Sequence, residues 1–326
     1  MNFRSGLAAA ALLAGFAATA AVASAGTRVA PGIAPAPPCK VIYLADFTGA
    51  KDLLYLNFSP WTSYSPLPAL PAVDNGWGLW ASANGVIYAG AAPNKINLHK
   101  ACGSQIGFTF VTAGFGAPAS IAADTSGNVY ATEAGSMVVD WFSGVTDTPA
   151  PYDTPRAPST PDYLALDNAG NVYLSGWNAA HTAEQVDVCG PHMVGCAPCE
   201  LLPGGTGPGG VALDGLQNLI VNSSPNKKLY VFHPGCGTLA SSYYYGPKFV
   251  FRDITLSTAE NLIWGGNDII ATIPGCSSPV CMDAQAVKYS ASSSPVVGPL
   301  VPAHTAPIIN SQKAGSGIAV YPPGPI

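Results

Sequence analysis

A short turn motif recurs along this chain and constrains the fold more than any other feature. The motif is clearest in Asp124-Thr-Ser-Gly-Asn-Val-Tyr and Asp167-Asn-Ala-Gly-Asn-Val-Tyr, and weaker copies begin at Ser82, Asp214 and Ser257. The copies start 42 to 47 residues apart. The leading Asp or Ser accepts hydrogen bonds from the backbone N–H groups that follow it, and glycine takes the positive φ that closes a hairpin. Each copy therefore predicts a tight turn between two strands.

Four short strands are expected in every repeat. An apolar segment precedes each turn, as at residues 121 to 123 and 164 to 166, and the strand Val-Tyr or Leu-Ile follows it. A third, alternating segment comes next, as at residues 228 to 232, and a weaker fourth follows it. Four strands in about 40 to 45 residues are typical of a β-propeller blade. The sequence therefore predicts an all-β propeller, and no segment of it has a convincing helical period.

The number of blades follows from how the ring closes. The apolar strand at residues 317 to 321 resembles the first, innermost strand of a blade (the inner strand), but no turn follows it. The strands at residues 41 to 46 and 52 to 58 have no inner strand before them. Because closure removes an exposed sheet edge, we expect these N- and C-terminal strands to share one blade. This predicts six blades, with residues 267 to 283 as an insertion and residues 302 to 316 as a loop. Seven blades, with a degenerate blade in that region, is the alternative.

The N-terminal residues have the pattern of a secretory signal peptide. Arg4 precedes an apolar run from Leu7 to Val22, and the small residues Ala23-Ser-Ala follow. This predicts cleavage near Ala25, a signal peptide over residues 1–25, a Pro-rich spacer over 26–38 and a single propeller domain over 39–326. The mature chain is then extracytoplasmic, either periplasmic or secreted, with no membrane span.

The eight cysteines are expected to form disulfide bonds, because an exported chain meets an oxidising compartment. The local pair Cys276 and Cys281 is one expectation. Cys189 pairs with Cys196 or Cys199, and the remaining one of these two pairs with Cys236. The last expected pair joins Cys39 to Cys102.

A zinc site is the alternative for one part of this set. Cys189, His192, Cys196 and Cys199 have the spacing of zinc ligands in a short loop. A redox role for the Cys-Ala-Pro-Cys element formed by residues 196 to 199 is a further alternative, although no helix follows it to lower a thiol pKa.

Charge limits the class of partner. The net charge is -5 and only 10% of the residues are charged, which argues against a surface that binds nucleic acid. We expect a monomer whose partner is a protein, a peptide or a glycan.

The repeat "apolar-Ala-apolar-Asp-x-x-Gly-Asn-Val-Tyr" resembles the NHL repeat and the six-bladed propellers related to SMP-30 and gluconolactonase. The resemblance covers most of the mature chain and implies a propeller fold; such propellers act as lactonases, lyases or binding scaffolds. Enzymes of the SMP-30 type hold a divalent cation with Glu, Asn and Asp in the channel. The inner strands here carry Ala, Leu and Val at such places. We therefore expect a binding or scaffold protein, without a cofactor; a metal-assisted lactonase, hydrolase or lyase is the alternative.

Two sets of loops on one face would form the site. Loops that enter inner strands and loops between second and third strands share a face, called the ligand face here. The candidate residues on it are Asp162, Asp253, Arg252, Glu133, His181, Trp177, Asn222 and Asp268. Asp162 and Asp253, with His181, could hold a divalent cation. The Asp-x-x-Gly-Asn turns lie on the opposite, turn face, where Asp124, Asp167 and Asp214 are interpreted as turn caps, and no catalytic residue is assigned.

Overall fold

A computed structural model gives the fold, and it describes most of the strand-forming part of the chain. The described residues are 41–46, 53–57, 78–82, 85–91, 94–101, 105–111, 118–133, 136–137, 139–143, 157, 159–202, 209–223, 226, 228–244, 251–257, 262–270, 280–288, 302–305 and 315–321. Within these ranges the secondary structure consists of β-strands and one short 3-10 helix, η1 (Pro191–Met193). None of these residues belongs to a helix long and apolar enough to cross a membrane.

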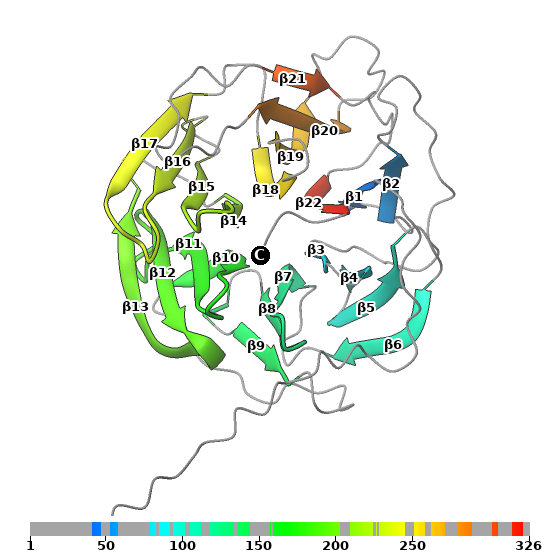
Figure 1. Cartoon of the computed structure of the whole chain (residues 1–326), viewed down its shortest axis with the longest axis horizontal. Helices are drawn as coiled ribbons and strands as arrows, with labels where there is room; N and C mark the ends of the chain where they lie inside the picture. Colours follow the sequence, from blue (N-terminus) through cyan, green and yellow to red (C-terminus); the bar gives the residue numbers. More distant parts are fainter. Residues whose placement is uncertain are drawn as a thin grey trace, which may run out of the picture.

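The described strands form six antiparallel sheets, and four of these have four strands each. They are β3 (Leu79–Ala81), β4 (Val86–Ala91), β5 (Lys95–Lys100) and β6 (Gln105–Val111); β10 (Thr160–Leu166), β11 (Val172–Trp177), β12 (Glu184–Gly190) and β13 (Val194–Leu201); β14 (Val211–Leu213), β15 (Leu219–Ser223), β16 (Lys228–Phe232) and β17 (Leu239–Tyr244); and β18 (Phe251–Ser257), β19 (Leu262–Ile270), β20 (Val280–Lys288) and β21 (Pro302–Thr305). A fifth sheet contains β7 (Pro118–Ala123), β8 (Val129–Glu133) and β9 (Val139–Phe142). The sheets follow one another around a ring, with β3, β7, β10, β14, β18 and β22 nearest its centre (Figure 1).

The sixth sheet joins the two ends of the folded chain. β1 (Val41–Asp46) pairs with β2 (Leu53–Asn57) on one side and with β22 (Gly315–Tyr321) on the other. Val41 lies opposite Tyr321 in this ladder, and Leu44 lies opposite Ile318. The predicted propeller fold, closed by N- and C-terminal strands in one sheet, is confirmed. The number of blades in the whole chain stays a prediction.

The region expected to hold an insertion and a loop has more strand than predicted. β19 and β20 form one long hairpin in which Asn267 lies opposite Asp283 and Ile270 lies opposite Val280. β21 then pairs with β20, with Gln285 opposite Thr305. Residues 267–270 and 280–283 thus belong to paired strands and not to an insertion, because the β19–β20 hairpin extends through them. Residues 271–279 lie outside the described residues.

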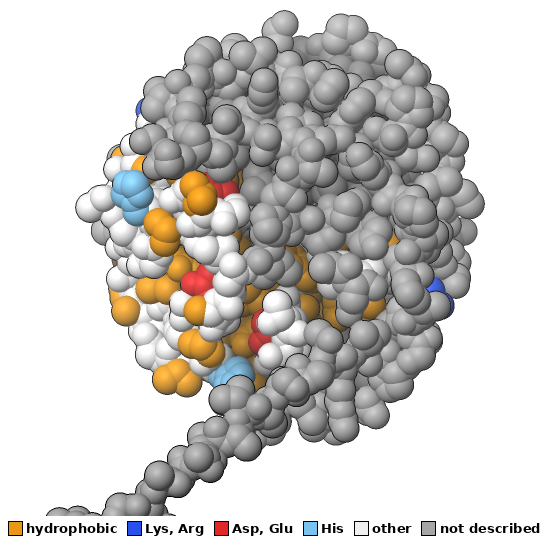
Figure 2. Space-filling model, in the orientation of Figure 1, with side chains coloured by type: hydrophobic (Ala, Val, Ile, Leu, Met, Phe, Trp, Pro, Cys, Tyr) orange, Lys and Arg blue, Asp and Glu red, His pale blue; other side chains and the backbone are white. Residues whose placement is uncertain are grey.

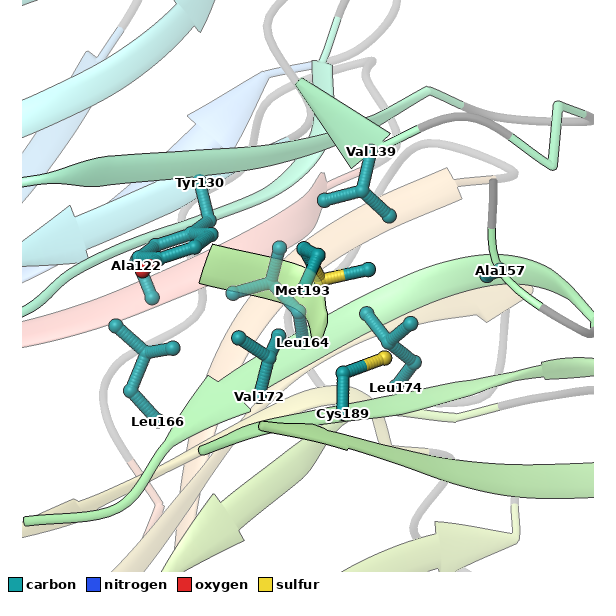
Figure 3. Packing of buried hydrophobic residues seen from close by; sticks show 10 residues of the cluster. All are labelled: Ala122, Tyr130, Val139, Ala157, Leu164, Leu166, Val172, Leu174, Cys189 and Met193. Atoms are coloured by element: carbon teal, nitrogen blue, oxygen red, sulfur yellow. The ribbon is translucent and has the colours of Figure 1, made fainter. Parts of the chain in front are cut away.

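The core lies between neighbouring sheets. Alternate residues of a strand point to opposite faces, so each sheet contributes to two layers. In β11, Val172 and Leu174 pack toward β7–β9, whereas Tyr173 packs toward β14–β17. Figure 3 shows the first of these layers, with Tyr130, Met193 and Leu164 close together. Burial on both faces explains why the inner and second strands are almost continuously apolar.

The aspartates of the repeated motif cap their turns by local hydrogen bonds. Asp214 Oδ1 accepts hydrogen bonds from the N–H groups of Leu216 (2.9 Å) and Asn218 (2.8 Å), and its Oδ2 accepts one from Asn218 Nδ2 (2.8 Å). Asp124 and Asp167 make the same three bonds to the corresponding residues of their own turns. Gly127 and Gly170 have φ of 84° and 82°, as the motif requires. The carboxylates of these turns therefore have a structural task.

Candidate functional site

Three side chains of the β10–β13 sheet meet at the ligand face. Thr160 begins β10 and lies opposite Trp177, the last residue of β11. His181 lies in the loop that follows β11, and its Nε2 is 3.4 Å from the Thr160 hydroxyl oxygen. The imidazole also lies against the Trp177 indole, with ring centroids 6.4 Å apart and planes inclined by 29°. Thr160 is buried, Trp177 is half-buried and His181 is exposed, so the three form a rim that solvent reaches.

The loop that carries His181 is held by Asn178. Its Oδ1 accepts a hydrogen bond from the Thr182 N–H (2.8 Å), and its Nδ2 donates to the Thr182 hydroxyl (3.1 Å). The backbone adds bonds from the Asn178 N–H to the Ala183 carbonyl (3.0 Å) and from the His181 N–H to the Asn178 carbonyl (2.8 Å). His181 adopts φ of 54°, in the left-handed region. These bonds fix the backbone of the loop that carries the exposed imidazole.

A buried carboxylate anchors the chain just before this rim. Asp187 on β12 is fully buried, and its Oδ2 accepts hydrogen bonds from the Ser159 N–H (3.0 Å) and from the Ser159 hydroxyl. Its Oδ1 accepts a third from Gln185 Nε2. The carboxylate holds the segment that leads into Thr160, because Ser159 directly precedes it. A hydrogen bond to a charged group contributes about 1.5–3 kcal/mol to the stability of a folded protein.

The sequence reasoning missed Asp187, although a signal for it exists. The residue lies opposite Leu174, at the same place in its repeat as Asp140, which lies opposite Ala131, and Asn97, which lies opposite Ala89. All three polar side chains are buried. The sequence therefore carries a detectable pattern, because a polar residue recurs at the same position of the third strand in three repeats.

The other candidate residues of the β7–β9 and β10–β13 sheets differ in their surroundings. Asp162 is half-buried, and its backbone carbonyl accepts a hydrogen bond from the Thr132 hydroxyl (3.0 Å). Glu133 ends β8 opposite Pro118 and is 6% exposed. Among the residues that the structure describes, no group of three or more His, Cys, Asp or Glu side chains could hold a metal ion. The cation site considered for Asp162, Asp253 and His181 stays a prediction, because the Asp253 side chain lies outside the described residues.

Asn222 lies one residue before the end of β15 and is fully buried. Its N–H donates to the Gly210 carbonyl (2.9 Å), and Gly209 packs so closely on its backbone and amide that a Cβ there would overlap with them. Its surroundings are those of a packed residue beneath the face. Arg252 and Asp253 belong to β18, and Asp268 belongs to β19; their side chains lie outside the described residues.

A buried acid and a buried tyrosine occupy the layer between β10–β13 and β14–β17. Glu184 begins β12 and is fully buried, and Tyr230 on β16 is 5% exposed. Burial raises the pKa of Tyr230, and the nearby Glu184 carboxylate raises it further. The Tyr230 hydroxyl therefore keeps its proton at neutral pH.

The cysteines in the described residues form two disulfides. Cys189 is bonded to Cys196, with an S–S distance of 2.04 Å, and Cys199 is bonded to Cys236. The pairing selects one of the two alternatives expected for Cys189. Cys196 packs in the layer toward β7–β9 and Cys199 in the layer toward β14–β17. The Cys-Ala-Pro-Cys element therefore serves two bonds on opposite faces of one sheet, and its sulfurs are not arranged as a thiolate cluster for zinc.

The remaining residues of the cysteine predictions have different positions. His192 follows Cys189 in the turn before β13, and its ring stacks on Trp141, with centroids 4.4 Å apart and planes inclined by 20°. Cys39, Cys102 and Cys276 lie outside the described residues, and Cys281 is described only as a backbone position in β20. The Cys276–Cys281 and Cys39–Cys102 pairs stay predictions.

The comparisons with known proteins agree on the fold. No family model matches the sequence, and no curated protein matches it. A chain in the crystal structure of a nidogen/laminin complex is similar in structure, with a TM-score of 0.62 and 13% identity, over 86% of this chain and 97% of that one. The β-propeller domain of Cps50 (Swd1) from Myceliophteria thermophila has a TM-score of 0.52 and 6% identity, over 75% of this chain and 74% of that one. These likenesses show a β-propeller fold.

Proposed function

We propose that this chain is an exported, NHL-like β-propeller that binds its ligand through the ligand face of the β10–β13 sheet. A propeller fold suggests a binding or scaffold role in general, because it presents many loops on a rigid framework. The observation that carries the proposal is the meeting of Thr160, Trp177 and His181 on a loop fixed by hydrogen bonds. Such a preorganised aromatic and polar rim loses little conformational entropy on binding.

Two further observations support the setting of this proposal. The N-terminal pattern of Arg4, an apolar run and Ala23-Ser-Ala is that of an export signal. The disulfides Cys189–Cys196 and Cys199–Cys236 are of a kind that persists in oxidising compartments. Analysis of the N-terminus of exported protein should find Gly26 first; a mature protein that keeps Met1 would contradict export by this signal. The similar chain in the nidogen/laminin structure was crystallised in a complex.

Site-directed photo-crosslinking tests the binding face. A benzophenone amino acid is placed at Ala180, in the exposed His181 loop, and in a second protein at Ala169, in the exposed Asp167 turn of the same sheet. Both positions are exposed alanines in turns of the same sheet, so the two proteins form a matched pair that carries the crosslinker on opposite faces. After incubation with the extracytoplasmic fraction of the source organism and irradiation, we expect adducts from the Ala180 protein and not from the Ala169 protein. Equal labelling at both positions, or none at Ala180, would contradict the proposal.

A further inference from the structure

We propose that Trp177, His181 and Thr160 form a subsite for the ring of a neutral saccharide. This inference rests on the proposed ligand face and names the chemical class of what binds there. It follows from three properties of the rim: an aromatic residue that solvent reaches, hydroxyl, amide and imidazole groups near it, and a loop fixed before any ligand arrives.

The aromatic surface is the first property. Trp177 is half-buried at the end of β11, so solvent reaches part of this residue. The His181 imidazole lies beside it at 6.4 Å between centroids, which is an offset arrangement. One face of a pyranose ring consists of C–H groups, and such an apolar surface packs well on an aromatic ring whose edge is in water. Trp177 is therefore suited to stack on a sugar ring.

Hydroxyl, amide and imidazole groups of the rim and its loop lie near that ring. Thr160 contributes a hydroxyl and His181 an imidazole, 3.4 Å apart, and the same loop carries the Asn178 amide and the Thr182 hydroxyl. The loop from residue 178 to residue 183 contains no Asp, Glu, Lys or Arg. Figure 2 shows one face of the molecule, on which the described side chains are mainly hydrophobic or uncharged, with Asp and Glu at a few separate places and basic groups only near the outline. The loop itself offers hydroxyl, amide and imidazole groups. Hydroxyls of a neutral sugar match such groups, whereas a charged ligand requires opposite charges.

The backbone of His181 is held in a left-handed conformation, which glycine could also adopt at this position. His181 has φ of 54°, a conformation in which glycine is free of strain and L side chains are strained. Glycine would therefore close this turn at least as well. The imidazole at this position lies beside Trp177 and 3.4 Å from the Thr160 hydroxyl oxygen, so it is placed where a ligand of the rim would contact it.

The molecule carries a second pair of the same residue types as a natural control. His192 is also exposed and also has positive φ, 60°, and it stacks on Trp141 at the turn face. The centroids of that pair are 4.4 Å apart and the planes are inclined by 20°, so the imidazole overlaps the indole more closely than in the Trp177 pair. The His192 pair leaves less aromatic surface for a ligand.

Titration calorimetry with defined oligosaccharides tests the subsite. The probes are cellotetraose, chitotetraose and maltotetraose, added to the oxidised mature protein. We expect at least one to bind, Trp177→Leu to weaken that binding at least tenfold, His181→Gly to weaken it severalfold, and His192→Gly to change it less than twofold. Trp177→Phe keeps an aromatic ring and should recover part of the affinity. Because each variant is first checked for the wild-type melting temperature, a loss of binding is not confused with unfolding.

The outcomes separate this inference from the proposed function. If no probe binds, or if a probe binds equally well to Trp177→Leu, the saccharide subsite is wrong. Photo-crosslinking at Ala180 still tests the ligand face on its own, since adducts with a protein there would keep the face and assign it to a protein ligand instead. Binding of a probe that His192→Gly abolishes and His181→Gly does not would move the site to the turn face and would overturn the inference.

Discussion

The hydroxyl group of Tyr130 accepts a hydrogen bond from the backbone N–H of His192, 62 residues further along the chain, at 3.4 Å. Tyr130 is the last residue of the Asp124 motif, and His192 lies in the outer turn of the next sheet. Tyr173 is at the same place in the Asp167 motif, and its hydroxyl group accepts a hydrogen bond from the backbone N–H of Gly235. Gly235 lies in the turn between β16 and β17, in the next sheet along the chain. The motif thus caps its own turn through Asp and holds the neighbouring sheet through Tyr.

Removal of these hydroxyls should destabilise the packing of neighbouring sheets. Burial raises the pKa of Tyr130 and of Tyr173 to about 12, so both are protonated at neutral pH. Tyr173 also donates to Asp167 Oδ2 at 3.2 Å. We expect Tyr130→Phe to lower the free energy of unfolding by about 1 kcal/mol and Tyr173→Phe by about 1.5–3 kcal/mol, because its partner is charged. Urea unfolding at pH 7 measures both, and unchanged midpoints would show that the two bonds add nothing.

The disulfide between sheets should contribute more stability than the one within a sheet. Cys199 and Cys236 are 37 residues apart, whereas Cys189 and Cys196 are 7 apart. A longer loop loses more entropy in the unfolded chain, which corresponds to about 4 kcal/mol for the first pair and about 2 kcal/mol for the second in the chain-entropy model. The double replacements Cys199→Ser with Cys236→Ser, and Cys189→Ser with Cys196→Ser, test this order by chemical unfolding. A larger loss for the short loop would contradict it.

Asp214 should be the most sensitive of the three turn aspartates. It is fully buried, whereas Asp124 and Asp167 are half-buried, although all three accept equivalent hydrogen bonds. Alanine at position 214 leaves the buried N–H and side-chain amide of Asn218 without this acceptor, so Asp214→Ala should lower the free energy of unfolding by about 2–4 kcal/mol. Asp124→Ala is the matched control and should have a smaller effect, since water can replace the lost carboxylate. Thermal and urea unfolding of both variants decide the order.

Stability should fall in acid because of His99. The side chain is fully buried on β5, and neither ring nitrogen has a hydrogen-bond partner in the described part of the chain. Burial lowers the pKa of His99 from 6.5 to about 4. The unfolded chain therefore binds the proton more readily, so stability is constant above about pH 6.5 and falls as the pH drops toward 4.

Replacement of His99 by leucine isolates this effect from the titration of carboxylates. The difference in unfolding free energy between His99→Leu and the wild type should grow in favour of the variant by up to about 3 kcal/mol between pH 6.5 and pH 4. Urea midpoints measured across that range provide the test. A difference that does not change with pH would mean that His99 has the same proton affinity in the folded and unfolded chain.

Part of the candidate site could be predicted from sequence, and part could not. The ligand-face positions of Trp177 and His181 follow from strand order alone, because the second strand of every repeat ends at that face. Their meeting with Thr160 depends on how β10 starts, which is set by the buried bond between Ser159 and Asp187, 28 residues apart. Glu133 and Asn222 were expected to face a ligand, and both are buried. The direction of a strand tells at which face of the molecule it ends, but it does not tell whether a side chain there is buried.

The sequence by itself determined the propeller, because its evidence is local: Asp167 bonds to residues two and four positions later, and the spacing of such turns sets the length of each sheet. The closure of the ring by β1 and β22 followed from strands left without partners. Only the tertiary structure decided that Cys189 pairs with Cys196 and Cys199 with Cys236, that Asp187 anchors Ser159, and that Tyr130 supports the next sheet. The contacts of Asp187 and Tyr130 join residues 28 and 62 positions away, so they depend on the twist and packing of whole sheets and no short stretch of sequence encodes them.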